Sequence, residues 1–259
     1  MSELKASLLM GCFLRTYLTG AAYNPRGLQN IGFTFAIEPA LAALYGPGKN
    51  LRDARLRYAR NYNCHPFFTP MLLGISLRME AEIAAGRLSP AVQEGIKDTT
   101  ANTLSAIGDS FFNGTALNTW AVAAACLVLA GLPRAALAMT AVLFVLLQFF
   151  KIATFILALR KGLAVLLFLR RLDLINWGDR FKYANALLLT LFLCLALPGA
   201  SALSWGGVGL YLLLAGWVVG RLHVPRVFVA LFLLAAAVAL HLSDIFPDIP
   251  RFFSIISGS

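Results

Sequence analysis

The sequence predicts an all-α, polytopic membrane protein with about five spanning helices and with re-entrant or interfacial helices in its N-terminal part. Composition is the first reason: 59% of the 259 residues are hydrophobic and 13% are charged, whereas soluble domains carry about 25% charged residues. The second is a series of apolar runs between residues 116 and 242. The third is the mixture of shorter apolar runs with Pro, Gly and acidic residues in 1–115. We therefore expect one membrane domain, made of an N-terminal helical part (1–115) and a transmembrane helical part (116–259).

The apolar runs define the expected spans, because a helix needs roughly 20 residues to cross the hydrocarbon core. The runs are Ala116–Leu132, Ala135–Leu159, Tyr183–Leu203, Gly207–Gly220 and Val227–Leu242. In the N-terminal part, Leu28–Tyr45 and Pro66–Leu77 are also apolar, but Pro or Gly interrupts them. Interrupted segments of this kind frame transport sites as re-entrant elements. The alternative is a pair of amphipathic helices that lie on the inner leaflet.

The basic residues, which give a formal net charge of +10, lie between the apolar runs. They form neither a basic tail nor an RNA-binding motif, so a nucleic-acid-binding function is not indicated. Lys and Arg instead accumulate in cytoplasmic loops of membrane proteins. The basic loop 160–182 is therefore predicted to be cytoplasmic, with a cytoplasmic N-terminus and an extracytoplasmic C-terminus. Arg52–Arg60 repeats bases at helical spacing, which predicts a cytoplasmic helix with an exposed basic face.

The sequence offers no set of residues that would make the chain an enzyme by itself. Its four cysteines are scattered, without a CxxC pair, so neither a zinc site nor a disulfide framework is expected. There is no nucleophile with a positioned base and no Gly-rich phosphate loop. His223 and His241 have no acidic or cysteine companions at ligand spacing. We expect no cofactor, no metal and no autonomous catalysis.

The most informative stretch is Gly108–Thr115, which places Asp109 between two glycines just before the long apolar runs. A charge at the edge of hydrocarbon is costly, so it normally faces a partner, a cavity or a polar pathway. Glycines allow close approach of backbone or ligand and permit turns. The stretch therefore predicts a polar site in a membrane protein.

An ordered series of short blocks carries a family resemblance. The blocks are Leu14-Arg15 with Tyr23-Asn24, Leu28–Leu41, Tyr62–Phe67, Leu73–Glu80, Gly95–Lys97, and Ile107–Asp109 with Gly114-Thr115. Their order and spacing resemble the IID membrane component of the mannose/fructose/sorbose-type sugar phosphotransferase system. The resemblance covers residues 14–160 and fades beyond them.

The resemblance implies a multi-pass subunit of the bacterial inner membrane. It implies pairing with a IIC membrane subunit in a hetero-oligomer that translocates a hexose or amino sugar. In that family, cytoplasmic IIA and IIB phosphocarriers hold the phosphate on histidines and phosphorylate the sugar. His65 is therefore not expected to be phosphorylated, although histidine is the phosphorylated residue of the system.

The matching blocks also supply the candidate substrate-binding residues. They are Asp109, Asn113, Thr115, Asn63, His65, Gln29 and Glu38. For several of them the sequence leaves a structural role open: Asp109 is equally suited to cap a helix N-terminus. Asn63 would cap a helix that has Pro66 in its first turn. Glu38 faces either a protein interior or water, depending on whether its segment enters the membrane.

The chain departs from the family pattern at Asn102–Ala106, where the family has a series containing Gly and Pro, and again at Asn113 and Glu38. These departures motivate an alternative, a membrane interaction or regulatory protein that retains the IID scaffold without transport. A stand-alone secondary transporter is a third reading, which the lack of an internal repeat disfavours. Lys151 interrupts the longest apolar run, and it should snorkel or pair with a carboxylate of this chain or a partner.

Overall fold

The computed structural model describes residues 4–196, and within them the fold is all-helical. The helices are α1 (Ala6–Arg15), α2 (Asn30–Tyr45), α3 (Lys49–Tyr58), α4 (Thr69–Ala84), α5 (Pro90–Gly108), α6 (Leu117–Leu129), α7 (Pro133–Lys161), α8 (Val165–Leu172) and α9 (Leu174–Ala196). Two 3₁₀ segments, Thr16–Ala22 and Gly162–Ala164, follow α1 and α7. A π-helical segment, Asp109–Ala116, joins α5 to α6.

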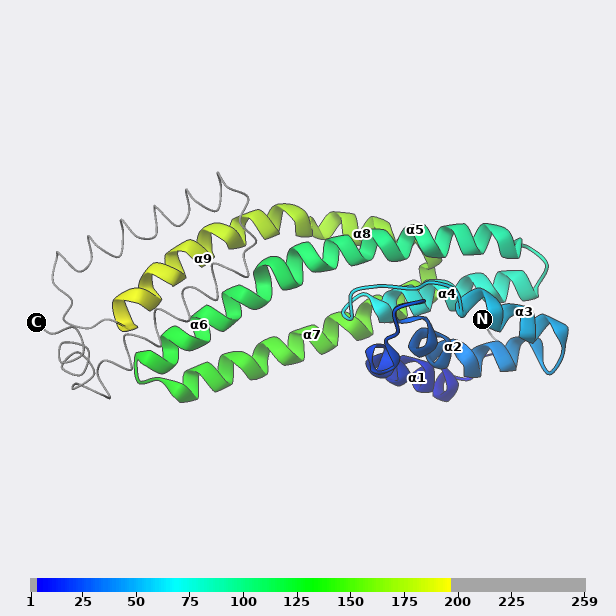
Figure 1. Cartoon of the computed structure of the whole chain (residues 1–259), viewed down its shortest axis with the longest axis horizontal. Coiled ribbons are helices and arrows are strands. Elements are labelled where there is room, and N and C mark those ends of the chain that lie inside the picture. Colours follow the sequence, from blue (N-terminus) through cyan, green and yellow to red (C-terminus); the bar gives the residue numbers. More distant parts are fainter. Residues whose placement is uncertain (1–3, 197–259) are drawn as a thin grey trace, which may run out of the picture. The chain divides into compact units, whose positions relative to one another are not determined.

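The central feature is one long helix, in which α5, the π-helical segment and α6 follow one another without a break (Figure 1). A tight turn at Gly131, where φ is +78°, reverses the chain into α7. Helix α7 runs back beside α6 and then packs against α4, while α9 packs against α6 and the π-helical segment. By length and composition, Pro90–Leu129 and Pro133–Ala196 are each able to cross a membrane.

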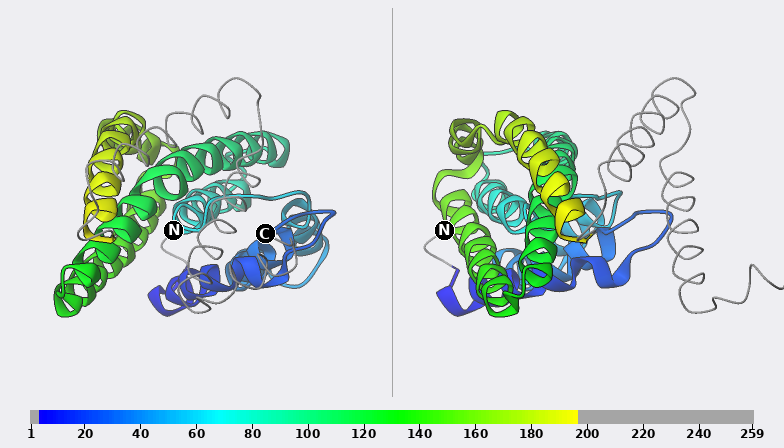
Figure 2. Two further views of the ribbon diagram at one scale, coloured as in Figure 1. Left: turned by 60° about the vertical axis from the view of Figure 1, so that its left-hand side comes forward. Right: turned by 90° about the vertical axis from the view of Figure 1, so that its left-hand side faces the viewer.

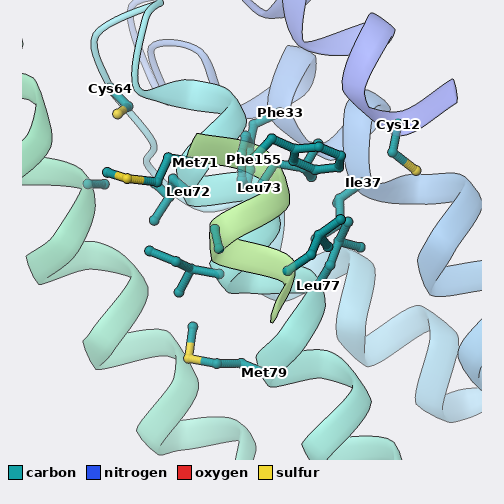
Figure 3. Packing of buried hydrophobic residues seen from close by; sticks show 14 of the residues in the cluster. Cys12, Phe33, Ile37, Cys64, Met71, Leu72, Leu73, Leu77, Met79 and Phe155 are labelled. Atoms are coloured by element: carbon teal, nitrogen blue, oxygen red, sulfur yellow. The ribbon is translucent and has the colours of Figure 1, made fainter. Parts of the chain in front are cut away.

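The N-terminal helices α1, α2 and α3 form a group beside α4 and the C-terminal half of α7 (Figure 2). Their shared core is made of large apolar side chains from α2, α4 and α7 (Figure 3). It includes Phe33, Ile37, Met71, Leu72, Leu73, Leu77 and Phe155, all of them buried. Burying one such side chain contributes about 1.5–3 kcal/mol. This cluster therefore fixes α4 against α2 on one side and α7 on the other.

A glycine allows the close contact between α4 and α7. A Cβ added to Gly74 would lie 2.7 Å from Cβ of Ala158 and 2.8 Å from the Phe155 carbonyl oxygen. Small residues at such a crossing let two backbones approach, as in helix pairs of membrane proteins. The family block that contains Gly74 thus has a packing role.

Helix α2 continues through the Glu38-Pro39 dipeptide that interrupts its apolar run. A proline inside a helix removes one backbone hydrogen bond and leaves the carbonyl four residues earlier without its donor. In α2 that carbonyl belongs to Phe35, and the Arg15 guanidinium donates to it at 3.2 Å. Arg15 also stacks 4.5 Å from the centroid of the Phe35 ring. A side chain from α1 therefore compensates for Pro39.

The structure bears on the predicted spans and loops in three ways. The longest predicted run, Ala135–Leu159, is confirmed as the body of α7. The basic segment 160–182 is largely helical, with α8 burying Val165 and Leu169 on one face, and its cytoplasmic location stays a prediction. Asp173, with φ of +50°, separates α8 from α9. The last two predicted runs lie outside the described residues, so a count of five spans stays a prediction.

Candidate functional site

The Gly-Asp motif of the sequence lies on the π-helical segment rather than on a turn. There, the Leu117 N–H bonds to the Phe112 carbonyl, five residues earlier. The wider turn leaves carbonyls that side chains satisfy: the Asn118 amide donates to the Asn113 and Gly114 carbonyls at 3.1 and 3.2 Å. π-helical segments within α-helices are frequently found at functional sites. The N-cap role that the sequence left open for Asp109 is wrong, since the helix continues through Gly108 and Asp109.

The π-helical segment brings two of the predicted site blocks together, because Gly108 touches His65. A Cβ added to Gly108 would lie 2.3 Å from Cβ and 2.4 Å from Cγ of His65. The His65 ring stacks on Phe112, with centroids 5.2 Å apart and planes 16° apart. Phe67 and Phe68 also contact Phe112. The absence of a side chain at Gly108 therefore allows the His65 side chain to pack directly against the backbone of α5.

The polar groups of this site are Asp109, Asn113 and His65. The Asn113 amide donates to Asp109 Oδ1 at 3.2 Å, and both side chains are exposed. His65 is buried beside them, and its Nδ1 accepts the Phe67 N–H at 3.3 Å. Burial lowers the pKa of His65, although the Asn113 side chain and the Asp109 charge act in the opposite direction. A neutral imidazole therefore supports an exposed carboxylate–amide pair.

Gln29 joins this region through the backbone of the His65 loop. Its side-chain oxygen accepts the Cys64 N–H at 3.5 Å, and its own N–H donates to the Tyr62 carbonyl at 2.8 Å. Burial raises the pKa of the Cys64 thiol to about 12. Gln29 thus positions the loop, and the inert Cys64 packs behind His65.

The other three candidates lie apart from this group. Glu38 is bound by Arg55 of α3, whose Nε lies 3.0 Å from both carboxylate oxygens. Thr115 is buried and donates to the Phe111 carbonyl at 2.6 Å. Asn63 is exposed and does not cap a helix: α4 begins at Thr69, with a proline in its first turn. The predicted helix entry at Asn63 is therefore wrong, because the His65 carbonyl accepts the N–H groups of the turn that precedes α4.

Lys151 of α7 is a neighbour of the site that the sequence did not assign to it. It is only 6% exposed, and its Nζ lies 3.7 Å from the centroid of the Tyr17 ring and 5.9 Å from that of Phe67. Within residues 4–196, no carboxylate lies within ion-pair distance of it. Its charge is close enough to His65 to disfavour a second positive charge there. The predicted pairing with a carboxylate of this chain is not found in that part of the structure.

A second buried polar group holds α3, α4 and α5 together. Glu80 of α4 is fully buried and accepts from Arg57 at 2.8 Å, from the Tyr45 hydroxyl at 2.6 Å and from the Tyr58 hydroxyl at 2.9 Å. Gln93 of α5 donates to the same Tyr58 hydroxyl at 2.7 Å. The predicted helix with an exposed basic face is thus confirmed as α3, but Arg57 is partly buried and bound to Glu80. The sequence analysis did not predict this cluster around Glu80. The signal for it was the single acidic residue at the end of the otherwise largely apolar block Leu73–Glu80.

The comparisons with known proteins agree on one family. The model of the PTS system mannose/fructose/sorbose family IID component matches residues 3–177. The chain belongs to this family. The fructose permease IID component of Bacillus subtilis is 28% identical over 124 residues, which make up 48% of this chain and 45% of that protein. The mannose-specific EIID component of Escherichia coli K12 is 30% identical over 131 residues, or 50% and 46% of the two chains. These matches span just under half the length of the curated relatives.

Two solved structures share the fold of this IID component. One, described as a membrane protein, aligns with a TM-score of 0.65 at 20% identity and covers 93% of this chain and 97% of its own. The other is a chain from the cryo-EM structure of the mannose transporter ManYZ with microcin E492, at a TM-score of 0.51 and 20% identity. That alignment covers 92% of this chain and 97% of the other.

Proposed function

We propose that this IID component is the membrane subunit of a phosphotransferase-system permease that pairs with a IIC subunit and lines part of the path of a hexose or amino sugar. The observation that carries the proposal is the exposed Asp109–Asn113 pair on the π-helical segment, supported from below by His65. The names of the family relatives, which are fructose and mannose components, support a hexose as the substrate class.

The chemistry of the pair fits a polyhydroxy ligand. A carboxylate accepts hydrogen bonds only, whereas an amide both donates and accepts. The two side chains lie four residues apart on the helix and are joined by one hydrogen bond, so the second carboxylate oxygen of Asp109 and the amide oxygen of Asn113 remain able to bind sugar hydroxyls side by side. The aromatic rings of Phe67 and Phe112 pack beneath the site, with their centroids 4.6 Å apart. Aromatic walls with a few polar groups are typical of small-molecule sites.

The site is open, which supports the need for a second subunit. Small-molecule sites commonly enclose about 70–90% of the surface of their ligand. Asp109 and Asn113 lie exposed on a helix surface, so residues 4–196 of this chain supply one wall of the site. A IIC subunit would supply the other wall. In line with this, one of the solved structures with a similar fold is described as the mannose transporter ManYZ.

Other parts of the proposal follow from the family. Phosphoryl transfer belongs to IIA and IIB partners, so the chain is not catalytic alone. It would lie in the bacterial inner membrane as a multi-pass protein with a cytoplasmic N-terminus. The regulatory alternative gains no support from relatives that are named as permease and phosphotransferase components.

The test is sugar uptake in cells that lack this chain and carry no paralogue, with labelled mannose, fructose and amino sugars. Loss of uptake, restored by the wild-type chain, is expected. Asp109→Asn should lower uptake about tenfold or more at normal membrane levels, since one good hydrogen bond to a charged group accounts for about 1.5–3 kcal/mol. Asp179→Asn, which removes an exposed carboxylate paired with Lys182, is the matched control. Full uptake in the deletion strain would refute the proposal.

A further inference from the structure

The apolar surface of α7 contains one buried cation without a counter-ion among the described residues. Lys151 is 6% exposed, and its described environment is aromatic, with Tyr17 above the ammonium and Phe67 further away. Tyr17 is held in place, because its hydroxyl donates to Gln148 one turn earlier on α7. A charge in a membrane-crossing helix normally pairs or faces a polar pathway. Cation–π contact compensates only part of the lost hydration.

The depth of Lys151 along α7 limits what its counter-ion can be. It lies ten residues before Lys161 and eighteen after Pro133, which places it about 15 Å and about 27 Å from the two helix ends. The hydrocarbon core is about 30 Å thick. If α7 crosses the membrane, a lipid phosphate at either surface is therefore too far away to neutralise Lys151. A group at the same depth must come from another protein segment.

The face of α7 next to Lys151 is open and apolar. Residues at spacings of three, four and seven lie on one side of a helix, so Gln148 and Phe144 precede Lys151 on the same face. Phe144 is 61% exposed and its neighbour Val145 is 63% exposed. Thr154 and Phe155, at spacings of three and four after Lys151, lie on the same side of the helix, and there the side chains are buried. A partner helix therefore has an apolar surface to pack on, with the cation at its edge.

We propose that Lys151 is the docking point of a membrane-embedded partner helix that presents an Asp or Glu carboxylate to it. Charge complementarity selects this occupant, because the ammonium is already buried without a counter-ion among the described residues, and a neutral helix would leave it uncompensated. The Tyr17 ring fixes the ammonium in advance, so little side-chain freedom is lost on binding. This inference rests on the proposed function, which requires a membrane partner, and adds the chemistry by which that partner is recognised.

Substitution at Lys151 tests the requirement for charge. The tagged full-length chain is purified from its native membrane in mild detergent, and the co-purifying membrane protein is quantified. Lys151→Met should reduce its recovery roughly tenfold or more, since removal of one member of a buried charge pair leaves the other uncompensated. Lys151→Arg should retain most of it. Lys161→Met removes one exposed positive charge from the same helix and should have no effect. Equal recovery with Lys151→Met and wild type would overturn the proposal.

A photo-crosslink identifies the occupant directly. A photoreactive phenylalanine analogue at Phe144, seven residues before Lys151, should capture a segment of a different membrane protein. That segment should carry an Asp or Glu within about seven residues of the crosslinked position, since both helices rise 1.5 Å per residue. Replacing that acid by Lys should restore the complex of a Lys151→Glu chain. Capture of lipid only, of a second copy of this chain, or of a segment without an acid would each overturn the proposal.

The deletion strain separates the two proposals. If uptake is lost without the chain but is normal with Lys151→Met, the docking inference fails and the permease function stands. If uptake persists without the chain, the permease function fails regardless of Lys151.

Discussion

Gly108→Ala is the most informative substitution, because it acts on the contact that assembles the candidate site. The new Cβ would lie 2.3 Å from Cβ of His65, whereas carbon atoms prefer a separation of about 3.5–4.0 Å. The α5 backbone and the His65 loop must therefore separate by more than about 1 Å. Overpacking of this kind costs about 1–3 kcal/mol.

A second effect of the substitution has the opposite sign and requires a control. Ala is favoured over Gly in a helix interior by about 1 kcal/mol. Gly95→Ala, in the same helix, gains this term alone, because a Cβ there meets nothing within 4 Å. The difference between the two variants isolates the steric cost at His65. We expect Gly95→Ala to be as stable as wild type or more so, and Gly108→Ala to be about 1–3 kcal/mol less stable than Gly95→Ala.

The assay is thermal unfolding in detergent, followed together with sugar uptake at matched membrane levels. Gly108→Ala should unfold several degrees below Gly95→Ala. It should also lower uptake, since the same displacement moves Asp109 and Asn113 away from His65. Equal stability and equal uptake of the two alanine variants would refute the argument that Gly108 and His65 build the site.

Three further predictions follow from contacts described above. Glu80→Gln should destabilise the protein by about 3–5 kcal/mol, because Arg57 is left with a buried, uncompensated charge; wild-type thermal stability would contradict this. Gly74→Ala should loosen α4 from α7, since its Cβ would meet Ala158 at 2.7 Å, and limited proteolysis should become faster. The lowered pKa of His65 means that the unfolded chain binds a proton more readily, so stability should fall as pH drops below about 6.5; His65→Gln should reduce that loss in melting scans from pH 8 to 5.

The elements that sequence could predict are those encoded by composition over a long window. Helix α7 is one, because an apolar run of this length is typical of a long helix. Helix α3 is another, because its basic residues recur at helical spacing. The contact between His65 and Gly108 joins two distant blocks, and only the family resemblance indicated that both belong to one site. Local rules placed the helix entry at Asn63 and allowed a helix N-cap at Asp109. Tertiary contacts overrode both: the His65 carbonyl accepts the N–H groups of the turn before α4, and the long helix continues through Asp109.

The roles of the charged residues were harder to foresee, since they depend on the packing of neighbouring elements. Glu38 proved to be the partner of Arg55, and the buried carboxylate is Glu80 of another block. Both acids lie among apolar residues in the sequence. Which one faces the interior is decided by the positions of α3 and α5, and a helical pattern alone does not contain that information.

The π-helical segment has a consequence for how insertions and deletions act in this chain. Each residue turns an α-helix by about 100°, so one residue added to a uniform helix would rotate all that follows. A widened turn accommodates an additional residue locally, and Asn118 supplies hydrogen bonds to the carbonyls that are left over. Loss of one residue between Asp109 and Ala116 would therefore close the widened turn to an ordinary α turn and leave α6 facing α9. The same loss within α5 or α6 would instead rotate all that follows by about 100°.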